Sequence, residues 1–350
     1  TNDRRQRQMC IRDRWIVSMI NTDVQPMYDY ADSMGYFMET FPGTGSAVLE
    51  WWKGDGSLLD FFNPDAVDWW KSHVDKTLAL GIDGWKCDGT DFSAILASWS
   101  PGANEFVSRL DYSHAYYRFF HDYTREQLDD NRVNTARPID NYGVADIGGE
   151  QVSFAPVDIN WAGWVGDQDA TFEGLEAALN NMYHSYEMGY LAFGSDIGGY
   201  REDNNYPQGR SKEVFIRWAQ LGAFSPIMEN GGGGEHRPWM FDTETTDIYR
   251  TMVKLHHVLI PYLMDCSKPY FDQGRSLMEF VNKDDYSFLL GPNIFVTPIM
   301  ENTNEVTINF PAGKNWVYIF DEEQIFEGGT TVTMTFGLDE YPAFMQEGIG

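Results

Sequence analysis

The stretch Gly81-Ile82-Asp83-Gly84-Trp85-Lys86-Cys87-Asp88-Gly89-Thr90-Asp91 carries the pattern that decides the fold. A short, mainly apolar run over 82–86 leads into the carboxylate of Asp88, and glycine and polar residues follow at once. A run of this length between turn residues is typical of a buried strand of a parallel sheet. In α/β folds the carboxyl ends of such strands carry the functional residues. The stretch therefore predicts a fold class and a site together.

The pattern returns in Trp161-Ala162-Gly163-Trp164-Val165-Gly166-Asp167-Gln168, where a strand predicted over 159–165 leads to Asp167. Further strands are predicted over 15–20, 132–135, 190–194 and 223–228, and helices from Pro64 onward and over 112–128, 171–188, 214–221 and 246–263. About six strand–helix repeats are typical of a parallel α/β fold. No GxGxxG follows an early strand, which favours a (β/α)₈ barrel over a doubly wound sheet. Because six repeats are fewer than eight, we expect the first barrel strands to be missing.

Local signals mark where two of these helices begin and end. Asn63-Pro64 combines an N-cap residue with a proline suited to the first turn. Val67, Trp70, Val74 and Leu78 then recur at helical spacing. At the other helix, Gly189 is placed to end the segment 171–188.

The sequence pattern changes after about Ser267. Short runs, several of which alternate apolar and polar residues, are separated by Gly, Asn and Pro. They predict strands over 287–290, 294–298, 306–310, 316–320 and 330–336. We therefore expect a partial barrel domain over 15–266 and a small antiparallel β-sandwich domain over 267–350. Residues 1–14 are basic in an acidic chain and lack an apolar core segment, so we expect a non-native leader outside the fold.

Composition narrows the partners. The 350 residues are 43% hydrophobic and carry a net charge of −28, which argues against nucleic acid as a partner because phosphate binding needs basic patches. The apolar runs are too short for a membrane span. Aromatic residues make up 15%, which suits stacking on sugars, although most of these rings must fill the core. Three cysteines without a CxxC pair predict neither a disulfide framework nor a zinc site. The compartment stays open.

Asp88 and Asp167 are the candidate catalytic pair. A retaining glycosidase needs one carboxylate to attack the anomeric carbon and one carboxylic acid to protonate the leaving oxygen. Lys86 stands two residues before Asp88 and so faces the same side of the strand. The alternative is that each aspartate caps a helix.

Several other chemistries find no support in the sequence. Gly231–Gly234 is not followed by Gly-Lys-Ser/Thr, which argues against a P-loop, and neither HExxH nor GxSxG is present. We interpret the glycine loop as flexible backbone that lets His236 and Arg237 approach a ligand, although a lone histidine is more often structural. His256-His257 lies within a predicted helix, where packing is the simpler role.

Several motifs, in order, resemble glycoside hydrolase family 31, the family of α-glucosidases, α-xylosidases and related enzymes. The resemblance spans about Trp15 to Gly350. It is carried by Trp51-Trp52-Lys53-Gly54, Leu59-Asp60-Phe61-Phe62-Asn63-Pro64, Gly84–Asp88, Ala162–Gln168, Gly194-Ser195-Asp196-Ile197-Gly198-Gly199 and Arg217–Pro226.

The resemblance implies a (β/α)₈ barrel with a β-sandwich after it and retaining hydrolysis of α-glycosides without cofactor or metal. Asp88 matches the nucleophile and Asp167 the general acid/base. The resemblance also implies a set of sugar-site residues: Asp196 and His236 near the cleavage point, Trp85, Trp164 and Phe224 as walls, and Lys86 and Asp91 in contact with or behind the sugar.

Two departures keep the substrate open. No Lys or Arg stands between Arg137 and Asp167, where many members place an arginine. Either the sugar is not α-glucose, or another residue such as Arg137 makes this contact. The loop around His236 also differs from the form seen in α-glucosidases. The prediction is an exo-acting retaining α-glycosidase on terminal α-glucosides or α-galactosides, with an oligosaccharide partner. A transglycosylase with the same covalent intermediate and a non-catalytic sugar-binding fragment are the alternatives.

Overall fold

A computed structural model describes residues 13–89, 93–140, 152–153 and 155–349. The chain forms two compact units, one that ends at Trp161 and one over Ala162–Gly350.

Parallel strands form the centre of the first unit. β1 (Asp13–Ile16) pairs with β5 (Gly84–Cys87), and β5 pairs with β8 (Thr135–Ala136). Helix α3 (Pro64–Leu78) precedes β5, and α5 (Arg109–Gln127) precedes β8. The predicted strand–helix alternation is therefore present in this unit. Asp13 and Arg14, which the sequence assigned to a leader, belong to β1 and pair with β5.

Both helices begin as their sequences dictate. The Asn63 side chain accepts a hydrogen bond from the Asp65 amide at 3.0 Å, which confirms the predicted cap of α3. Ser108 caps α5 in the same way. The apolar faces of the two helices pack into one core, which includes Trp70, Val74 and Phe120.

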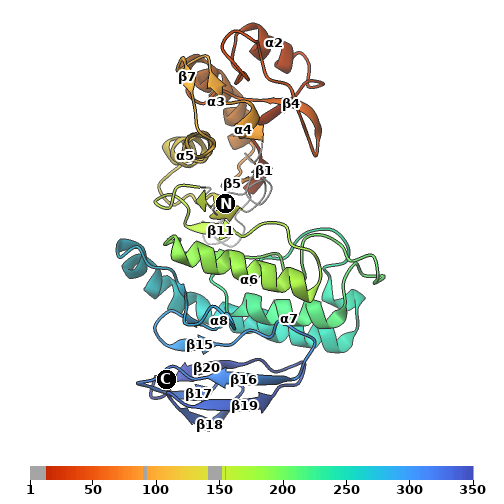
Figure 1. Cartoon of the computed structure of the whole chain (residues 1–350), viewed down its shortest axis with the longest axis vertical. Helices are drawn as coiled ribbons and strands as arrows, with labels where there is room; N and C mark the ends of the chain where they lie inside the picture. Colours follow the sequence, from red (N-terminus) through yellow and green to blue (C-terminus); the bar gives the residue numbers. More distant parts are fainter. Residues whose placement is uncertain (1–12, 90–92, 141–151, 154, 350) are drawn as a thin grey trace, which may run out of the picture. The chain divides into compact units, whose positions relative to one another are not determined.

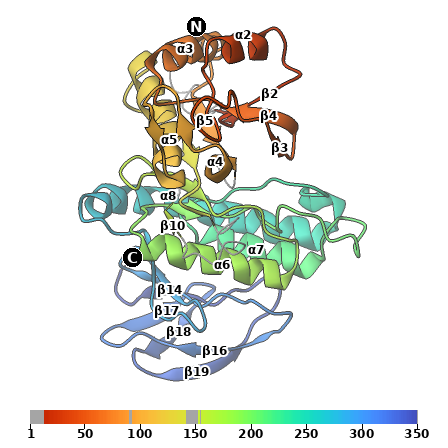
Figure 2. The ribbon, with the colours of Figure 1, turned by 45° about the horizontal axis from the view of Figure 1, so that its top comes forward.

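A second, smaller set of elements completes the first unit (Figure 2). An antiparallel sheet in the order β2–β4–β3 stands near helix α2 (Met27–Ser33). The short elements are β2 (Met19–Asn21), β3 (Leu49–Trp51), β4 (Gly54–Leu58), α4 (Ser93–Leu96), β6 (Trp99–Ser100), β7 (Glu105–Phe106), β9 (Ile139–Asp140) and β10 (Val152–Ser153). The strand predicted over 15–20 is thus two strands in different sheets, because the chain leaves the parallel sheet after Ile16.

The second unit begins with two parallel strands and three long helices. β11 (Ala162–Trp164) pairs with β12 (Phe193–Gly194), and α6 (Phe172–Glu187) connects them. Thr171 caps α6, and Gly189 follows it with a φ of +80°, as predicted. α7 (Lys212–Ala223) and α8 (Thr243–Asp272) follow, with the short 3₁₀ helix η1 (Pro238–Met240) between them.

One predicted strand of this unit is wrong. The sequence predicts a strand over 223–228, whereas α7 ends at Ala223 and a turn follows. The strand-like pairing here is a bridge from Glu229, just past the predicted strand, to Asp196. The turn is largely buried and mostly apolar, and a short apolar run of this kind has the same pattern as a core strand.

An antiparallel β domain ends the chain. One sheet has the order β13–β14–β15–β20–β17–β18, and β16 pairs with β19. The bounds are β13 (Met278–Phe280), β14 (Phe288–Leu290), β15 (Ile294–Val296), β16 (Glu305–Asn309), β17 (Asn315–Tyr318), β18 (Asp321–Glu327), β19 (Thr331–Thr335) and β20 (Ala343–Gln346). Within the second unit, α6, α7 and α8 form a layer beside these strands (Figures 1 and 2).

The five predicted strands of this domain are present, and β13, β18 and β20 were missed. β18 escaped prediction because its sequence, Asp-Glu-Glu-Gln-Ile-Phe-Glu, is acidic and largely exposed, so it lacks an apolar alternation. The boundary predicted at 266/267 falls inside α8, which continues to Asp272 with Pro261 and Pro269 within it. Over the described ranges no helix is long and apolar enough to cross a membrane.

Candidate active site

Asp88 lies at the carboxyl end of β5, and two side chains hold its carboxylate. Arg137 places Nε 2.8 Å and Nη2 2.7 Å from Oδ1. The indole Nε1 of Trp15, on the neighbouring strand β1, donates to Oδ2 at 2.9 Å. Asp88 is 9% exposed and Arg137 4%, so the ion pair is shielded from water but still reachable at the carboxylate.

These contacts fix the orientation of the Asp88 carboxylate. Guanidinium and indole nitrogens can only donate, so both carboxylate oxygens accept hydrogen bonds. That arrangement stabilises the ionised, oriented carboxylate, which is the form that attacks a carbon centre. Arg137 therefore acts on Asp88 directly, whereas the sequence assigned it to the sugar.

An exposed indole covers the backbone that follows Asp88. Gly89 has a φ of +51°, and a Cβ placed there would lie 2.6 Å from Cη2 of Trp52. Trp52 is 56% exposed, so part of it is open to solvent beside Gly89, the residue after Asp88. Neither Trp15 nor Trp52 was among the predicted site residues. Trp15 pairs with Lys86 in register, a signal that appears only once the strand pairing is known.

Strand alternation separates the other predicted residues of β5. Lys86 and Asp88 share one face, whereas Trp85 lies on the other, 2% exposed, with its ring 5.3 Å from Phe120 and its Nε1 donating to Thr124 at 3.0 Å. We therefore do not keep Trp85 as a wall of the sugar site, because it packs against α5. Asp91 lies outside the described residues.

Cys87 and the backbone of Asp88 are tied to α5. The Tyr116 hydroxyl lies 2.9 Å from the Ile16 carbonyl and 3.0 Å from the Asp88 carbonyl. Complete burial raises the pKa of the Cys87 thiol well above its usual value, so this cysteine is chemically inert at neutral pH.

In the second unit, Asp167 follows β11 and the positive-φ residue Gly166. The Val165 amide donates to the Gly194 carbonyl at 3.0 Å, which fixes the end of the strand just before Asp167. Asp167 is partly exposed. The neighbouring Asp169 pairs with Arg201 at 3.1 Å on the surface. Asp167 thus stands at a strand end with a partly exposed side chain.

Asp196 occupies the corresponding place after β12 and is almost fully buried. The next residue, Ile197, donates its amide to the Glu229 carbonyl at 3.1 Å. Gly199, with a φ of +83°, brings the chain so close to Ala170 that a Cβ there would lie 2.6 Å from its Cα. This close approach positions the turn that carries Asp196 and accounts for the glycine pair 198–199.

The glycine-rich loop is held in one shape. Gly232 has a φ of +127°, and a Cβ there would lie 2.6 Å from the Tyr200 carbonyl oxygen. The half-buried His236 sits with Nε2 3.0 Å from the Gly233 carbonyl. Burial, and then the charge of Arg210, lower the pKa of His236 below its usual value, so the ring is neutral at pH 7. The sequence interpretation of a flexible loop is corrected here, because the glycines permit close packing.

Arg210 is the residue that organises this loop, and no pattern in the sequence points to it. It is fully buried, and its guanidinium donates to the carbonyls of Gly198, Gly199, Gly233 and Glu235. One side chain therefore joins the turn after Asp196 to the loop before His236. Charged donors to four carbonyls make the pair of loops rigid.

Trp164 and Phe224 lie inside the second unit. Phe224 is fully buried and stacks on Tyr341 at 6.1 Å, and Trp164 is 1% exposed. Rings without exposed faces cannot stack on a sugar, so we do not keep either as a wall. His256 packs as predicted, with Nδ1 3.2 Å from the Ala223 carbonyl. In the part of the chain that the structure describes, no group of three metal-ligating side chains is found.

Comparisons with known proteins give the family of the chain and agree with its fold. Residues 2–266 match the model for the glycosyl hydrolases family 31 TIM-barrel domain, and residues 270–349 match the model for the family 31 C-terminal domain. The first range ends and the second begins within α8.

The curated relatives are much longer than this chain. The "Alpha-xylosidase" of Emericella nidulans is 26% identical over 95% of this chain and 42% of the relative. The "Isomaltosyltransferase" of Sporosarcina globispora is 28% identical over 85% of this chain and 28% of the relative. The chain spans less than half the length of these relatives.

Solved structures show the same fold at lower identity. The cycloalternan-forming enzyme from Listeria monocytogenes, in complex with a pentasaccharide substrate, superposes with a TM-score of 0.79 at 23% identity, over 96% of this chain and 33% of that one. The Flavobacterium johnsoniae GH31 dextranase, complexed with glucose, gives 0.79 at 20%, over 99% and 44%. These likenesses bear on the fold.

Proposed function

The chain belongs to glycosyl hydrolase family 31, and from that premise we propose that it is a retaining exo-α-glycosidase acting on terminal α-linked hexose. The observation that carries the proposal is the carboxylate of Asp88, held by Arg137 and Trp15 at the end of a parallel strand. A helix cap would instead accept from backbone amides of a following helix.

In the first step, Asp88 attacks the anomeric carbon. A bond forms between its carboxylate oxygen and that carbon, and the bond from the carbon to the leaving oxygen breaks. Asp167 gives its proton to the leaving oxygen, which departs as an alcohol. The product is a β-linked glycosyl-enzyme, because attack occurs from the face opposite the leaving group.

In the second step, the ionised Asp167 takes a proton from water, and the water oxygen bonds to the anomeric carbon while the ester to Asp88 breaks. Two inversions restore the α configuration. Asp196, His236 and Lys86 are the residues we propose to contact or orient the sugar, with the indole of Trp52 as a candidate stacking face beside Asp88.

Azide separates the two catalytic roles by stereochemistry. Asp88→Ala should reduce kcat on an aryl α-glycoside by about 10⁴-fold or more. Azide should then attack the sugar directly and give a β-glycosyl azide. Asp167→Ala still forms the glycosyl-enzyme from an activated substrate, and azide should then give the α-glycosyl azide.

Asp169→Ala is the matched control, since Asp169 lies two residues from Asp167 and pairs with Arg201 at the surface. It should keep its activity and form no azide adduct. Swapped anomers in the two variants would reverse the roles, and no adduct from either variant would refute the double displacement.

The sugar is tested with aryl α-glucoside, α-galactoside, α-xyloside and α-N-acetylgalactosaminide. We propose a hexoside, with kcat/KM highest for the glucoside or the galactoside. A preference for the xyloside, as the name of the Emericella nidulans relative suggests for that protein, would overturn the hexose assignment. Binding without turnover of any substrate would favour a non-catalytic sugar-binding protein.

Transglycosylation is the second candidate, favoured by the 28% identity to the Sporosarcina globispora isomaltosyltransferase. The glycosyl-enzyme would then pass to a sugar hydroxyl in place of water. Product analysis at high substrate concentration separates the two reactions: longer oligosaccharides indicate transfer, and free hexose indicates hydrolysis.

A further inference from the structure

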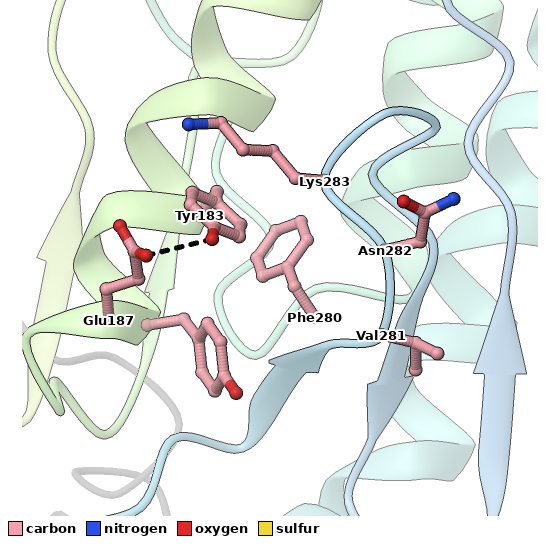
Figure 3. A pocket seen from close by; sticks show the side chains of 7 residues that line it. Tyr183, Glu187, Phe280, Val281, Asn282 and Lys283 are labelled. Atoms are coloured by element: carbon pink, nitrogen blue, oxygen red, sulfur yellow. Dashed lines mark hydrogen bonds between the residues drawn. The ribbon is translucent and has the colours of Figure 1, made fainter.

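A cavity of about 440 Å³ lies in the second unit, between the last turns of α6 and the loop that follows β13 (Figure 3). Tyr183, Tyr186 and Glu187 line it from the helix, and Phe280, Asn282 and Lys283 line it from the other side. Its volume falls within the range of roughly 300–1,000 Å³ of small-molecule sites. None of these residues takes part in the proposed catalysis.

Three aromatic rings form the apolar part of the cavity. The ring of Phe280 lies 5.5 Å from that of Tyr183 and 5.9 Å from that of Tyr186. The two tyrosines are three residues apart, so the helix presents them on the same side. Both are only partly buried, which leaves ring surface for a ligand.

Polar groups surround these rings. The Glu187 carboxylate accepts from the Tyr183 hydroxyl at 2.8 Å and lies 2.9 Å from Nδ1 of His184, so it is fixed in place (Figure 3). The ammonium group of Lys283 stands 5.0 Å from the centre of the Tyr183 ring. The Asn282 side-chain oxygen accepts from the Asp284 amide at 3.0 Å, so this side chain is held by its own loop.

This lining selects the chemistry of the ligand. One carboxylate and one ammonium group balance in charge. An anion such as phosphate is repelled by Glu187, and a cation is repelled by Lys283. A neutral pyranose fits both groups: its hydroxyls donate to Glu187 and accept from Lys283, while the apolar face of its ring stacks on tyrosine.

The place of the cavity in the second unit separates it from Asp167. α6 begins just after Asp167 and returns the chain from the carboxyl end of β11 to the amino end of β12. Tyr186 is 14 residues beyond Phe172, which is about 20 Å along the helix axis. The cavity therefore lies at the amino ends of the strands, the side where barrels carry no catalytic residues.

We propose that this cavity is a non-catalytic binding site for a neutral sugar unit of an oligosaccharide. It tethers the glycan through stacking and hydrogen bonds and leaves the sugar chemically unchanged. The proposal goes beyond the glycosidase function and does not depend on which linkage is cleaved.

Calorimetric titration of the Asp88→Ala protein with isomaltotriose and with maltotriose tests the site. At least one of these sugars should bind at a site whose affinity falls about tenfold or more in Asp88→Ala/Tyr186→Ala, because a stacking ring is lost. Tyr186→Phe in the same background keeps the ring and should stay within about threefold. Equal affinities with and without the Tyr186→Ala substitution would overturn the proposal.

A second variant avoids the packed helix. Asn282→Ala/Lys283→Ala changes only the partly exposed loop and should weaken the same site while the melting temperature stays constant. Unchanged sugar affinity in this variant would also contradict the proposal. Binding of inorganic phosphate in place of either sugar would identify an anion site and overturn it.

Activity on a small aryl α-glycoside keeps the two hypotheses apart. Tyr186→Ala with Asp88 intact should keep kcat/KM on this substrate within about twofold, since the cavity is not catalytic. If the parent protein lacks activity but the titration shows the site, the proposed function fails and the binding site stands. If activity is present and the titration shows no such site, the reverse holds.

Discussion

Arg137 is the residue that holds the Asp88 carboxylate most directly. Its Nε and Nη2 both contact Oδ1, and both partners are buried. Removing one partner of a buried ion pair leaves the other charge without compensation, which costs about 3–5 kcal/mol.

Arg137→Ala should therefore lower the stability by about 3 kcal/mol or more and reduce kcat by about 10²-fold or more. Arg137→Lys keeps the charge but not the planar geometry, and it should recover part of kcat. Chemical denaturation and aryl glycoside kinetics measure the two effects. An Arg137→Ala protein with unchanged kcat and a raised KM would instead return Arg137 to the role of a sugar ligand.

His236 makes the stability of the folded protein depend on pH. Burial lowers its pKa in the folded protein below the unfolded value, so the unfolded chain binds more protons at low pH. The contribution of the neutral His236 to the free energy of unfolding is then fully present above about pH 6.5, and it is lost as the pH falls below that value. His236→Gln should reduce the loss of unfolding free energy between pH 7 and pH 5. The same loss in the variant and the parent would show that His236 is not neutral in the fold.

At the scale of elements, Arg210 explains why a loop with four consecutive glycines keeps one shape. Its four carbonyl partners lie in the turn after Asp196 and in the loop before His236. The glycines allow the backbone to come close, and the guanidinium supplies the attraction.

Arg210→Met keeps much of the side-chain volume but leaves these buried carbonyls without a donor. We expect a loss of about 3 kcal/mol or more in stability and a rise in KM, because the loops with Asp196 and His236 lose their order. Arg237→Met is the control from the same loop: Arg237 is exposed and pairs with Glu235 at the surface, so the change should stay within about 0.5 kcal/mol. Equal effects of the two substitutions would contradict the role given to Arg210.

At the scale of the whole molecule, α7 connects the helical layer of the second unit to the β domain. Arg217 donates to the carbonyls of Gly337 and Glu340, and Gln220 donates to those of Leu338 and Glu340. Both side chains are buried. This contact makes the β domain part of the same cooperative structure as α7.

Arg217→Ala should lower the stability by about 2–4 kcal/mol, since it opens this contact and leaves buried carbonyls unpaired. Differential scanning calorimetry should show the transition of the second unit moving to lower temperature as one peak. Arg250→Ala, which removes a surface pair with Asp247, should leave that transition in place. Splitting of the peak in the parent protein would show that the two layers unfold independently.

The sequence by itself determined the features that depend on near neighbours. Asn63 caps α3 through an amide two residues away, Thr171 caps α6 through Gly174, and Gly189 follows α6 in the conformation that glycine favours. The strand ends that carry Asp88 and Asp167 follow from apolar runs of a few residues. These are short-range effects, so a linear reading captures them.

Only the tertiary structure decided what surrounds those carboxylates. Arg137 and Trp15 reach Asp88 across separations of 49 and 73 residues, and Trp85, next to the site in sequence, turns to the opposite face of its strand. Register and strand alternation set these positions, and a shift of one residue would exchange the two faces. The sequence therefore supplied the two candidate carboxylates and the family, and the pairing of distant strands determined which residues lie beside Asp88.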